Sequence, residues 1–251
     1  MKLVLALLVL LAACRRGEPA PAPGSQALAD GPCSQQLFEG SRFSVCPAGD
    51  LRIETRWADR QGRPFRGFVA LEQALGAQAE RVAFAMNAGM FGHANEPIGL
   101  YVEDHRTLAE LNRRKGGGNF HVMPNGVFLV RDDGKAAVVT SAEFQPSPNI
   151  RFATQSGPML VVAGAINPRF SADSPSRYVR NGVGIGPDGR PVFVMSDDEV
   201  SMGKFARFFQ QALHCRDALY LDGSVSSLWV PEHGRRDAFA AIGPMIVALR
   251  P

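Results

Sequence analysis

Short apolar runs typical of strands recur along most of the chain, and tight turns separate them. Asp-Gly readily adopts the positive φ angles that two-residue hairpin turns require, so an Asp-Gly pair between two apolar runs predicts a β-hairpin. Two hairpins are predicted in this way, one with residues 126–130 and 136–140 around Asp133-Gly134 and one with residues 183–186 and 192–196 around Asp188-Gly189.

Helical spacing of apolar residues occurs in only two segments. The first has Phe68, Leu71 and Leu75 on one face, and it leads into an apolar run at residues 82–86. The second follows Ser201, a candidate N-cap, and leads into an apolar run at residues 218–221. Its apolar face comprises Phe205, Phe208, Phe209, Ala212 and Leu213. The pattern therefore predicts an α+β fold, a single strand-rich domain with a mixed sheet and a few helices.

One short sequence motif occurs twice in nearly the same form. Gly157-Pro158 is followed by Met-Leu-Val-Val, and Gly243-Pro244 by Met-Ile-Val-Ala. Gly-Pro before an apolar strand suggests two neighbouring strands that begin at one rim of a sheet.

The first residues have the features of a secretory leader. Met1-Lys2 is followed by an apolar run at residues 3–13, which is shorter than the roughly 20 residues of a spanning helix. Leu11-Ala12-Ala13-Cys14 resembles a lipoprotein signal, in which Cys14 is lipidated and becomes the new N-terminus. Ordinary cleavage, with Cys14 incidental, is the alternative. We expect a signal peptide at residues 1–13 and a protein anchored by lipid in the cell envelope, facing the periplasm or the exterior.

Residues 14–32 are rich in Pro, Ala, Gly and Ser and are predicted to be a flexible linker after the lipidated cysteine. Residues 33–251 are predicted to form the folded domain. Removing Lys2 with the leader leaves 27 − 1 = 26 basic residues against 24 acidic ones, a net charge of +2. This balance, without a basic stripe, excludes nucleic acid as an expected partner.

Three cysteines remain after Cys14, and an oxidising compartment favours pairing two of them. Cys33 and Cys46 flank a segment that resembles a hairpin, so a Cys33–Cys46 disulfide is predicted, with Cys215 buried and free. Pairing of Cys46 with Cys215 is the rival arrangement. No Cys-x-x-Cys is present, which makes a cysteine metal site unexpected.

Candidate functional residues lie at strand ends beside glycines. Such turns project short side chains rigidly into a cleft, although each alone is also typical of a simple turn. Two groups follow apolar strands and two precede them: Asn87-Ala88-Gly89, Asp222-Gly223-Ser224, Gln155-Ser156-Gly157-Pro158 and Arg180-Asn181-Gly182.

Signatures of common hydrolases and nucleotide sites are absent. Ser156 is not in a Gly-x-Ser-x-Gly elbow, and no His-Glu-x-x-His occurs. Lys115-Gly116-Gly117-Gly118-Asn119 lacks Walker spacing, so no nucleotide is expected, and the segment is predicted to be a mobile loop or lid.

Metal binding is not expected to be required. His93, His105 and His121 lie in one loop-rich stretch and are interpreted as surface residues rather than ligands. Asp197-Asp198-Glu199 is a candidate for calcium, although a solvated turn is the preferred interpretation.

Taken in order, five motifs resemble the phosphodiester glycosidase family: Met86-Asn87-Ala88-Gly89-Met90-Phe91, Gln155-Ser156-Gly157-Pro158-Met159, Arg180-Asn181-Gly182-Val183-Gly184, Tyr220-Leu221-Asp222-Gly223-Ser224 and Gly243-Pro244-Met245. The resemblance extends from about residue 50 to residue 249 and is strongest to a bacterial periplasmic or lipid-anchored branch. Two departures from the uncovering enzyme of that family occur. Asp222 is followed by a single glycine rather than a longer glycine run, and Arg180 by Asn181-Gly182 rather than by threonine and alanine.

The resemblance implies hydrolysis of a sugar-1-phosphate diester in an envelope glycan or glycolipid, without a cofactor. Arg180 would pair with phosphate oxygens, and Asp222 would activate water or stabilise the positive charge that develops on the sugar. The implied substrate-binding residues are Asn87, Gly89, Asn119, Ser156, Gly157, Asn181, Gly223 and Ser224.

This assignment requires Arg180 and Asp222 to face one pocket, lined by residues 87 and 156. Glu103 and Asp197 are weak candidates for a second carboxylate. A non-catalytic envelope module that binds glycan or phosphate in the same cleft is the first alternative, and a hydrolase of another class, such as a calcium-dependent one, is the second.

Overall fold

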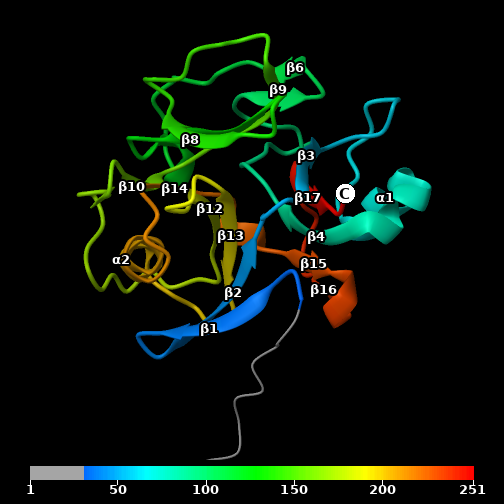
Figure 1. The fold of residues 1–251 in the computed structure, drawn as a ribbon. Coiled ribbons are helices and arrows are strands. Elements are labelled where there is room, and N and C mark those ends of the chain that lie inside the picture. The colour runs from blue at the N-terminus through cyan, green and yellow to red at the C-terminus, as the bar shows by residue number, and fades with distance from the viewer. Residues whose placement is uncertain (1–30) are drawn as a thin grey trace, which may run out of the picture.

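The structure is a computed structural model that describes residues 31–251. The predicted signal peptide, the predicted lipidation site Cys14 and nearly all of the predicted linker lie outside the described residues. Within the described part of the chain, the strands form three sheets, which occupy the lower left, the right and the top of Figure 1.

Each sheet is named here after one of its strands. The β14 sheet has the strand order β1 (Ser34–Phe38), β2 (Ser41–Pro47), β13 (Pro191–Ser196), β12 (Asn181–Ile185), β14 (Asp217–Tyr220), β10 (Met159–Val162) and β11 (Ala165–Ile166). The β4 sheet has the order β16 (Arg235–Arg236), β15 (Leu228–Val230), β4 (Val82–Asn87), β17 (Met245–Leu249) and β3 (Arg52–Arg56). The β9 sheet has the order β6 (Arg106–Ala109), β5 (Tyr101–Glu103), β9 (Ile150–Ser156), β7 (Gly126–Arg131) and β8 (Ala136–Thr140).

All of the pairings between these strands are antiparallel, so the expectation of a mixed sheet was wrong. A parallel pair requires a crossover connection, which is usually a helix that packs on the sheet. The two α-helices here are short and cover outer faces instead. The fold is α+β and mostly β.

Both Asp-Gly hairpins are confirmed. Strand β7 pairs with β8 around Asp133-Gly134, and β12 pairs with β13 around Asp188-Gly189. Gly134 and Gly189 both have a φ of 77°, in the left-handed region that glycine adopts without strain.

Both predicted helices are also present. Helix α1 (Phe68–Leu75) buries Phe68 and Leu71 against the β4 sheet, where Phe68 lies 6.0 Å from the ring of Trp229. Helix α2 (Met202–Arg207) begins at Ser201, whose hydroxyl accepts a hydrogen bond from the backbone amide of Lys204 at 3.1 Å. The predicted cap is therefore correct.

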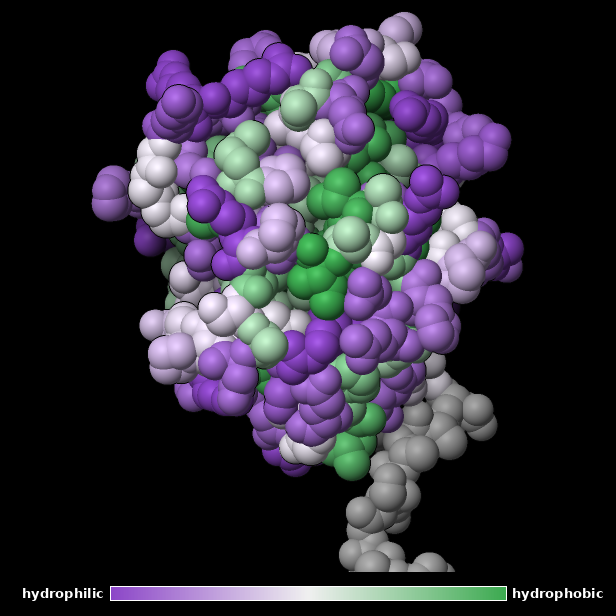
Figure 2. All heavy atoms as spheres, turned by 90° about the vertical axis from the view of Figure 1, so that its left-hand side faces the viewer, coloured by the Kyte–Doolittle hydropathy of each residue, from purple (hydrophilic) through white to green (hydrophobic). Residues whose placement is uncertain are grey.

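The second helix differs from the expectation at its end, where a π-helical turn (Phe208–Ala212) replaces α-helix. Phe205, Phe208 and Phe209 are all buried against the β14 sheet, and Phe208 stacks on Phe43 with ring centroids 4.0 Å apart. Figure 2 shows the side of the molecule on which α2 and β10 lie, where a band of apolar side chains is bordered by hydrophilic ones.

The main core lies where the three sheets meet. Phe193 of the β14 sheet contacts Phe84 of the β4 sheet at 5.4 Å and Phe128 of the β9 sheet at 5.5 Å between ring centroids. All three side chains are fully buried. The three sheets therefore share one core, which fixes the ends of their strands relative to one another.

The expectation that the two Gly-Pro motifs begin neighbouring strands was wrong. Strand β10, after Gly157-Pro158, belongs to the β14 sheet, whereas β17, after Gly243-Pro244, lies between β4 and β3. A short sequence motif indicates where a strand begins but not which strand it pairs with, because long-range packing selects the neighbouring strand.

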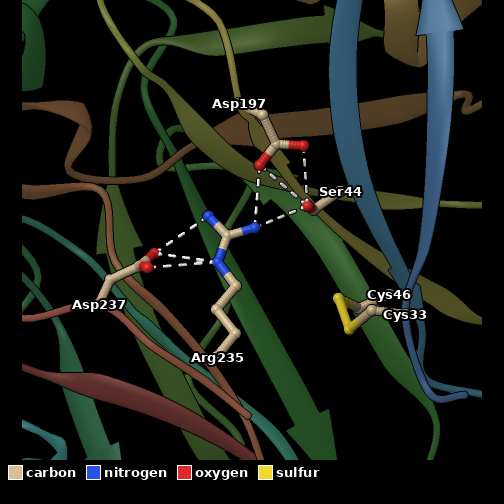
Figure 3. Close-up of a disulfide and its surroundings, with 6 residues drawn as sticks. All are labelled: Cys33, Ser44, Cys46, Asp197, Arg235 and Asp237. Atoms are coloured by element: carbon tan, nitrogen blue, oxygen red, sulfur yellow. Dashed lines mark hydrogen bonds and ion pairs between the residues drawn. A yellow bond between two sulfur atoms is a disulfide. The ribbon is translucent and has the colours of Figure 1, made fainter. Parts of the chain in front are cut away.

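The Cys33–Cys46 disulfide is confirmed and ties β2 to the start of β1 (Figure 3). Cys215 is buried and free, and its burial raises the pKa of the thiol to about 12. Across residues 31–251, helices are too short or too polar to cross a membrane.

Candidate active site

The chain just after β14 is held by three of the sequence motifs at once. The backbone amides of Tyr220, Leu221 and Asp222 donate to the backbone oxygens of Pro158, Asn181 and Ala88, respectively, at 3.1, 3.0 and 3.2 Å. The Ala88 amide in turn donates to the Pro244 oxygen at 2.8 Å. All five motifs therefore converge on the segment that carries Asp222.

Asn87 is the side chain that joins these segments. Its amide donates to the backbone oxygen of Asp222 at 2.7 Å, while its Oδ1 accepts from the Ser227 amide at 2.8 Å and from Nδ2 of Asn181 at 2.9 Å. Asn87 and Asn181 are both buried. Their side chains therefore position the Asp222 segment from behind.

Gly89 and Gly157 occupy places where a side chain has no room. A Cβ at Gly89 would lie 2.2 Å from the backbone oxygen of Gln155, and one at Gly157 would lie 2.6 Å from Cβ of Asn125. The Gly89 amide donates to Thr154 Oγ1 at 3.2 Å. These glycines therefore allow the end of β4 to dock against β9.

Arg180 is a buried cation, 2% exposed, at the start of β12. Its guanidinium donates to the Val200 oxygen at 2.7 Å, to the Ser176 oxygen at 3.0 Å and to the Tyr220 hydroxyl at 3.3 Å. A guanidinium has five N–H donors, so about two remain for a ligand.

No carboxylate of the described residues forms an ion pair with Arg180. Its guanidinium carbon lies 5.5 Å from the ring of Tyr178 and 5.6 Å from that of Tyr220. Burying an unpaired charge is costly unless a ligand compensates it. An arginine in this state is suited to an anion, and its planar group matches phosphate.

A pocket of about 330 Å³ lies against this guanidinium. Its lining residues are Asn119, Ser176, Tyr178, Arg180, Met202, Tyr220, Gly223 and Ser224. Ser224 is exposed and belongs to the 3₁₀ turn η4 (Gly223–Val225), which begins directly after Asp222.

Asp222 is 9% exposed, and its Oδ1 accepts from the backbone amide of Ser224 at 3.2 Å. Burial raises the pKa of this carboxyl above its ordinary value, and the Ser224 amide opposes that shift. The Tyr220 hydroxyl, which accepts from Arg180 at 3.3 Å, is influenced by the charges of both Arg180 and Asp222. Burial is the main cause that raises its pKa; the Arg180 charge lowers this pKa and the Asp222 charge raises it. Both charged groups therefore act on one buried hydroxyl.

The predicted site residues divide into two sets. Arg180, Asn119, Gly223 and Ser224 line the pocket, with Asp222 next to them in the chain. Asn87, Gly89, Ser156, Gly157 and Asn181 are buried and outside its lining. Their assignment to substrate binding stays a prediction.

Ser156 has a buried Oγ without a hydrogen-bond partner, as has the Oδ1 of Asn125, within the described part of the chain. Ser156 pairs with Gly126 in the β9 sheet, so these two unpartnered groups lie near each other.

Sequence reasoning missed four pocket residues: Ser176, Tyr178, Met202 and Tyr220. Tyr220 had a signal, because it belongs to the same sequence motif as Asp222, two positions before it. Ser176 and Tyr178 lie in an irregular segment before β12, where no periodicity marks them.

Two of the carboxylates considered for calcium, Asp197 and Asp198, form ion pairs with arginines. Asp197 accepts from Arg235 at 2.9 Å and from the Ser44 hydroxyl at 3.0 Å, as Figure 3 shows. Asp198 pairs with Arg42 at 2.7 Å. Residues 31–251 contain no group of three or more His, Cys, Asp or Glu side chains that could hold a metal ion.

Glu103, the other weak candidate for a second carboxylate, accepts from the Tyr101 hydroxyl at 2.9 Å and lies outside the pocket lining. Burial raises its pKa. His121, in the loop-rich stretch, contacts the backbone oxygen of Arg114 at 2.8 Å through Nδ1. The loop at residues 115–118 leads directly into Asn119 of the pocket, and its role as a lid stays a prediction.

A buried arginine faces the pocket, and the turn that follows Asp222 lines it through Gly223 and Ser224, an arrangement suited to an anion. The family model of phosphodiester glycosidases matches residues 80–247, a range that includes all five motifs of this site. The chain belongs to the phosphodiester glycosidase family.

The chain also has a bacterial relative of similar sequence. The chain is 37% identical over 188 residues to the uncharacterized protein YigE of Escherichia coli (strain K12), covering 75% of this chain and 73% of that protein.

Two solved structures share the fold. The zebrafish N-acetylglucosamine-1-phosphodiester alpha-N-acetylglucosaminidase catalytic domain, auto-inhibited by its pro-peptide, matches with a TM-score of 0.59 and 14% identity, covering 87% of this chain and 82% of that one. A hypothetical protein from Synechocystis matches with a TM-score of 0.53 and 15% identity, covering 87% and 62%, respectively.

Proposed function

We propose that this protein hydrolyses a glycosyl phosphodiester at the bond between the sugar carbon and the phosphate oxygen. The observation that carries the proposal is Arg180, a buried guanidinium without a carboxylate partner in the described chain, facing a pocket of about 330 Å³. Family membership supports the reaction class.

In this mechanism Arg180 binds the phosphate. Its two remaining N–H groups donate to two non-bridging oxygens, which neutralises charge and orients the diester. Ser224, an exposed residue of the pocket lining, and Asn119 contact the sugar or the phosphate.

Asp222 acts as the general base. A water oxygen attacks C1 of the sugar, the C1–O bond to phosphate breaks, and the water proton passes to the Asp222 carboxylate. The products are a free sugar and a phosphate monoester. Because burial raises the pKa of Asp222, its carboxylate is a stronger base than an exposed aspartate and suits this role.

The proposed substrate is an envelope glycan or glycolipid. This part of the proposal rests on the predicted leader and on Cys14 as a lipidation site, which would hold the domain close to such substrates. Replacing Cys14 by Ser should release the protein from the membrane fraction, and membrane retention of that variant would contradict the anchor.

The reaction is tested with methyl esters of α- and β-linked hexose 1-phosphates in ¹⁸O-labelled water. The proposal expects the label at the sugar C1 hydroxyl. Label in the phosphate would indicate attack at phosphorus and a hydrolase of another class. Binding without turnover would support the non-catalytic module.

Asp222→Asn is the matching variant, because an amide oxygen can still accept from the Ser224 amide. We expect its rate to fall by about 10³-fold or more while folding persists. Asp217→Asn on the same strand is the control, because its oxygen can still accept from the Ala163 amide, a bond of 2.9 Å in the native protein. Full activity of Asp222→Asn would remove Asp222 from the mechanism.

A further inference from the structure

Tyr220 has a hydroxyl group at the centre of the site, although its side chain is only 2% exposed. It lines the pocket together with Arg180 and Gly223. It is the last residue of β14 and lies two positions before Asp222 in the chain.

The hydrogen bonds of this hydroxyl leave its proton available. Arg180 donates to the Tyr220 oxygen at 3.3 Å, so the oxygen acts as the acceptor in that contact. A phenol carries one proton of its own to donate. Within residues 31–251 the Tyr220 hydroxyl donates no hydrogen bond. Burial raises the pKa of Tyr220, which keeps the hydroxyl protonated at neutral pH.

The backbone next to Asp222 is shaped around this hydroxyl. A Cβ at Gly223 would lie 1.8 Å from the Tyr220 oxygen and 2.6 Å from the ring carbon that bears it. Gly223 is therefore required for the hydroxyl to reach the pocket between Arg180 and the turn that follows Asp222.

We propose that Tyr220 is a catalytic residue whose hydroxyl donates a hydrogen bond to the phosphate oxygen that leaves the sugar. The inference rests on the proposed function and assigns a role to a side chain that the mechanism above leaves unused. Arg180 holds the non-bridging oxygens, and Tyr220, against the same guanidinium, meets the bridging oxygen.

Charge development explains why this contact accelerates the reaction. In the substrate the bridging oxygen is a weak acceptor. As the C1–O bond breaks, both bonding electrons stay on that oxygen, and its negative charge grows. A donor fixed at this point binds the transition state more tightly than the substrate, which raises kcat rather than lowering KM. The Tyr220 proton remains on the phenol, so Asp222 still receives the only proton that is transferred.

The test compares wild type with Tyr220→Phe, which keeps the ring and removes the hydroxyl. We expect kcat to fall by about 10- to 10³-fold with KM changed less than about threefold. The fall should be larger for a methyl ester than for a nitrophenyl ester, because the poorer leaving group depends more on the donor. Tyr101→Phe is the control, since it removes a buried phenol hydroxyl in the β9 sheet, outside the pocket lining.

Two results would overturn the role. One is an unchanged kcat in Tyr220→Phe. The other is an equal fall for both esters, which would indicate that Tyr220 only orients Arg180.

Binding of inorganic phosphate, measured by calorimetry, separates this inference from the proposed function. Phosphate resembles the charged product, so its affinity should fall about tenfold in Tyr220→Phe whether or not the esters are hydrolysed. Wild type that binds phosphate but cleaves no ester would contradict the proposed function alone. Equal phosphate affinity in both proteins would contradict the contact with Tyr220.

Discussion

The side-chain amide of Asn87 donates a hydrogen bond of 2.7 Å to the backbone oxygen of Asp222, 135 positions further along the chain. This bond joins the end of the β4 sheet to the end of the β14 sheet. The position of the candidate base is therefore set by the packing of two sheets and not by its own turn alone.

Replacing Asn87 by Ala should destabilise the fold by about 2–4 kcal/mol, because it leaves the Ser227 amide and the Asp222 oxygen without their buried partner. The Asn181 side-chain amide would lose one of its two bonds and keep the one to the backbone oxygen of residue 87. Urea unfolding measures the effect. Asn149→Ala on the exposed surface is the control and should change stability by less than about 0.5 kcal/mol. A similar small change in both variants would show that the Asn87 junction contributes little.

The buried carboxyl of Asp222 should make stability depend on pH. Its pKa in the folded protein is raised above the ordinary value of 3.8, so the folded state binds more protons than the unfolded state over the interval between the two. The stabilising effect is fully present below pH 3.8 and is lost as the pH rises through the folded pKa.

Asp222→Asn removes this titration, so its stability should gain on that of wild type as the pH rises. Urea unfolding at several pH values from 3 to about 8 checks the sign, with Asp217→Asn as the matched variant. A difference between Asp222→Asn and wild type that stays constant with pH would contradict the raised pKa.

A methyl group at residue 223 should disrupt the site. In Gly223→Ala the Cβ would lie 1.8 Å from the Tyr220 hydroxyl oxygen, so ester hydrolysis should fall by about 10²-fold or more as the ring or the turn moves. Gly67→Ala is the control, because a Cβ there has nothing within 4 Å. Retained activity in Gly223→Ala would mean that the turn yields without displacing Asp222 or Tyr220.

The disulfide closes a loop with a sequence separation of 13 and should stabilise the protein by about 3 kcal/mol. The double variant Cys33→Ser/Cys46→Ser should lose that amount in urea unfolding. Dithiothreitol should destabilise wild type similarly and have no further effect on the double variant. An equal response of both proteins to the reductant would place the stabilisation elsewhere.

The free thiol of Cys215 should be inert in the native protein. It is buried, and its pKa is about 12, so little thiolate exists at pH 8. Iodoacetamide should therefore modify residue 215 only after unfolding, as peptide mass mapping would show. Rapid native modification would contradict its burial.

Local chemistry made several features predictable. Asp-Gly pairs identified the β7–β8 and β12–β13 hairpins, and Ser201 identified the start of α2. Cys33 and Cys46 were paired correctly because a hairpin between them brings the two together. Each of these signals acts over a few residues, where backbone preference and spacing are sufficient.

The pairing of strands that are distant in the sequence was predicted less well. The partners of β10 and β17 differed from the expectation, and the sheets are antiparallel rather than mixed. Strand partners are selected by the shared core, in which Phe193 contacts Phe84 and Phe128, and no local pattern encodes which strands meet there.

The amino-acid sequence alone was sufficient to identify the family, the hairpins and the helices, because each depends on local preference or on a recognisable motif. The catalytic roles of Arg180 and Asp222 stay predictions. Only the tertiary structure could reveal that Asn87 and Asn181 hold the Asp222 segment, and that the Tyr220 hydroxyl contacts Arg180 at the pocket. These roles depend on which buried groups face one another across sheets, and burial is a property of the packed chain rather than of any single segment.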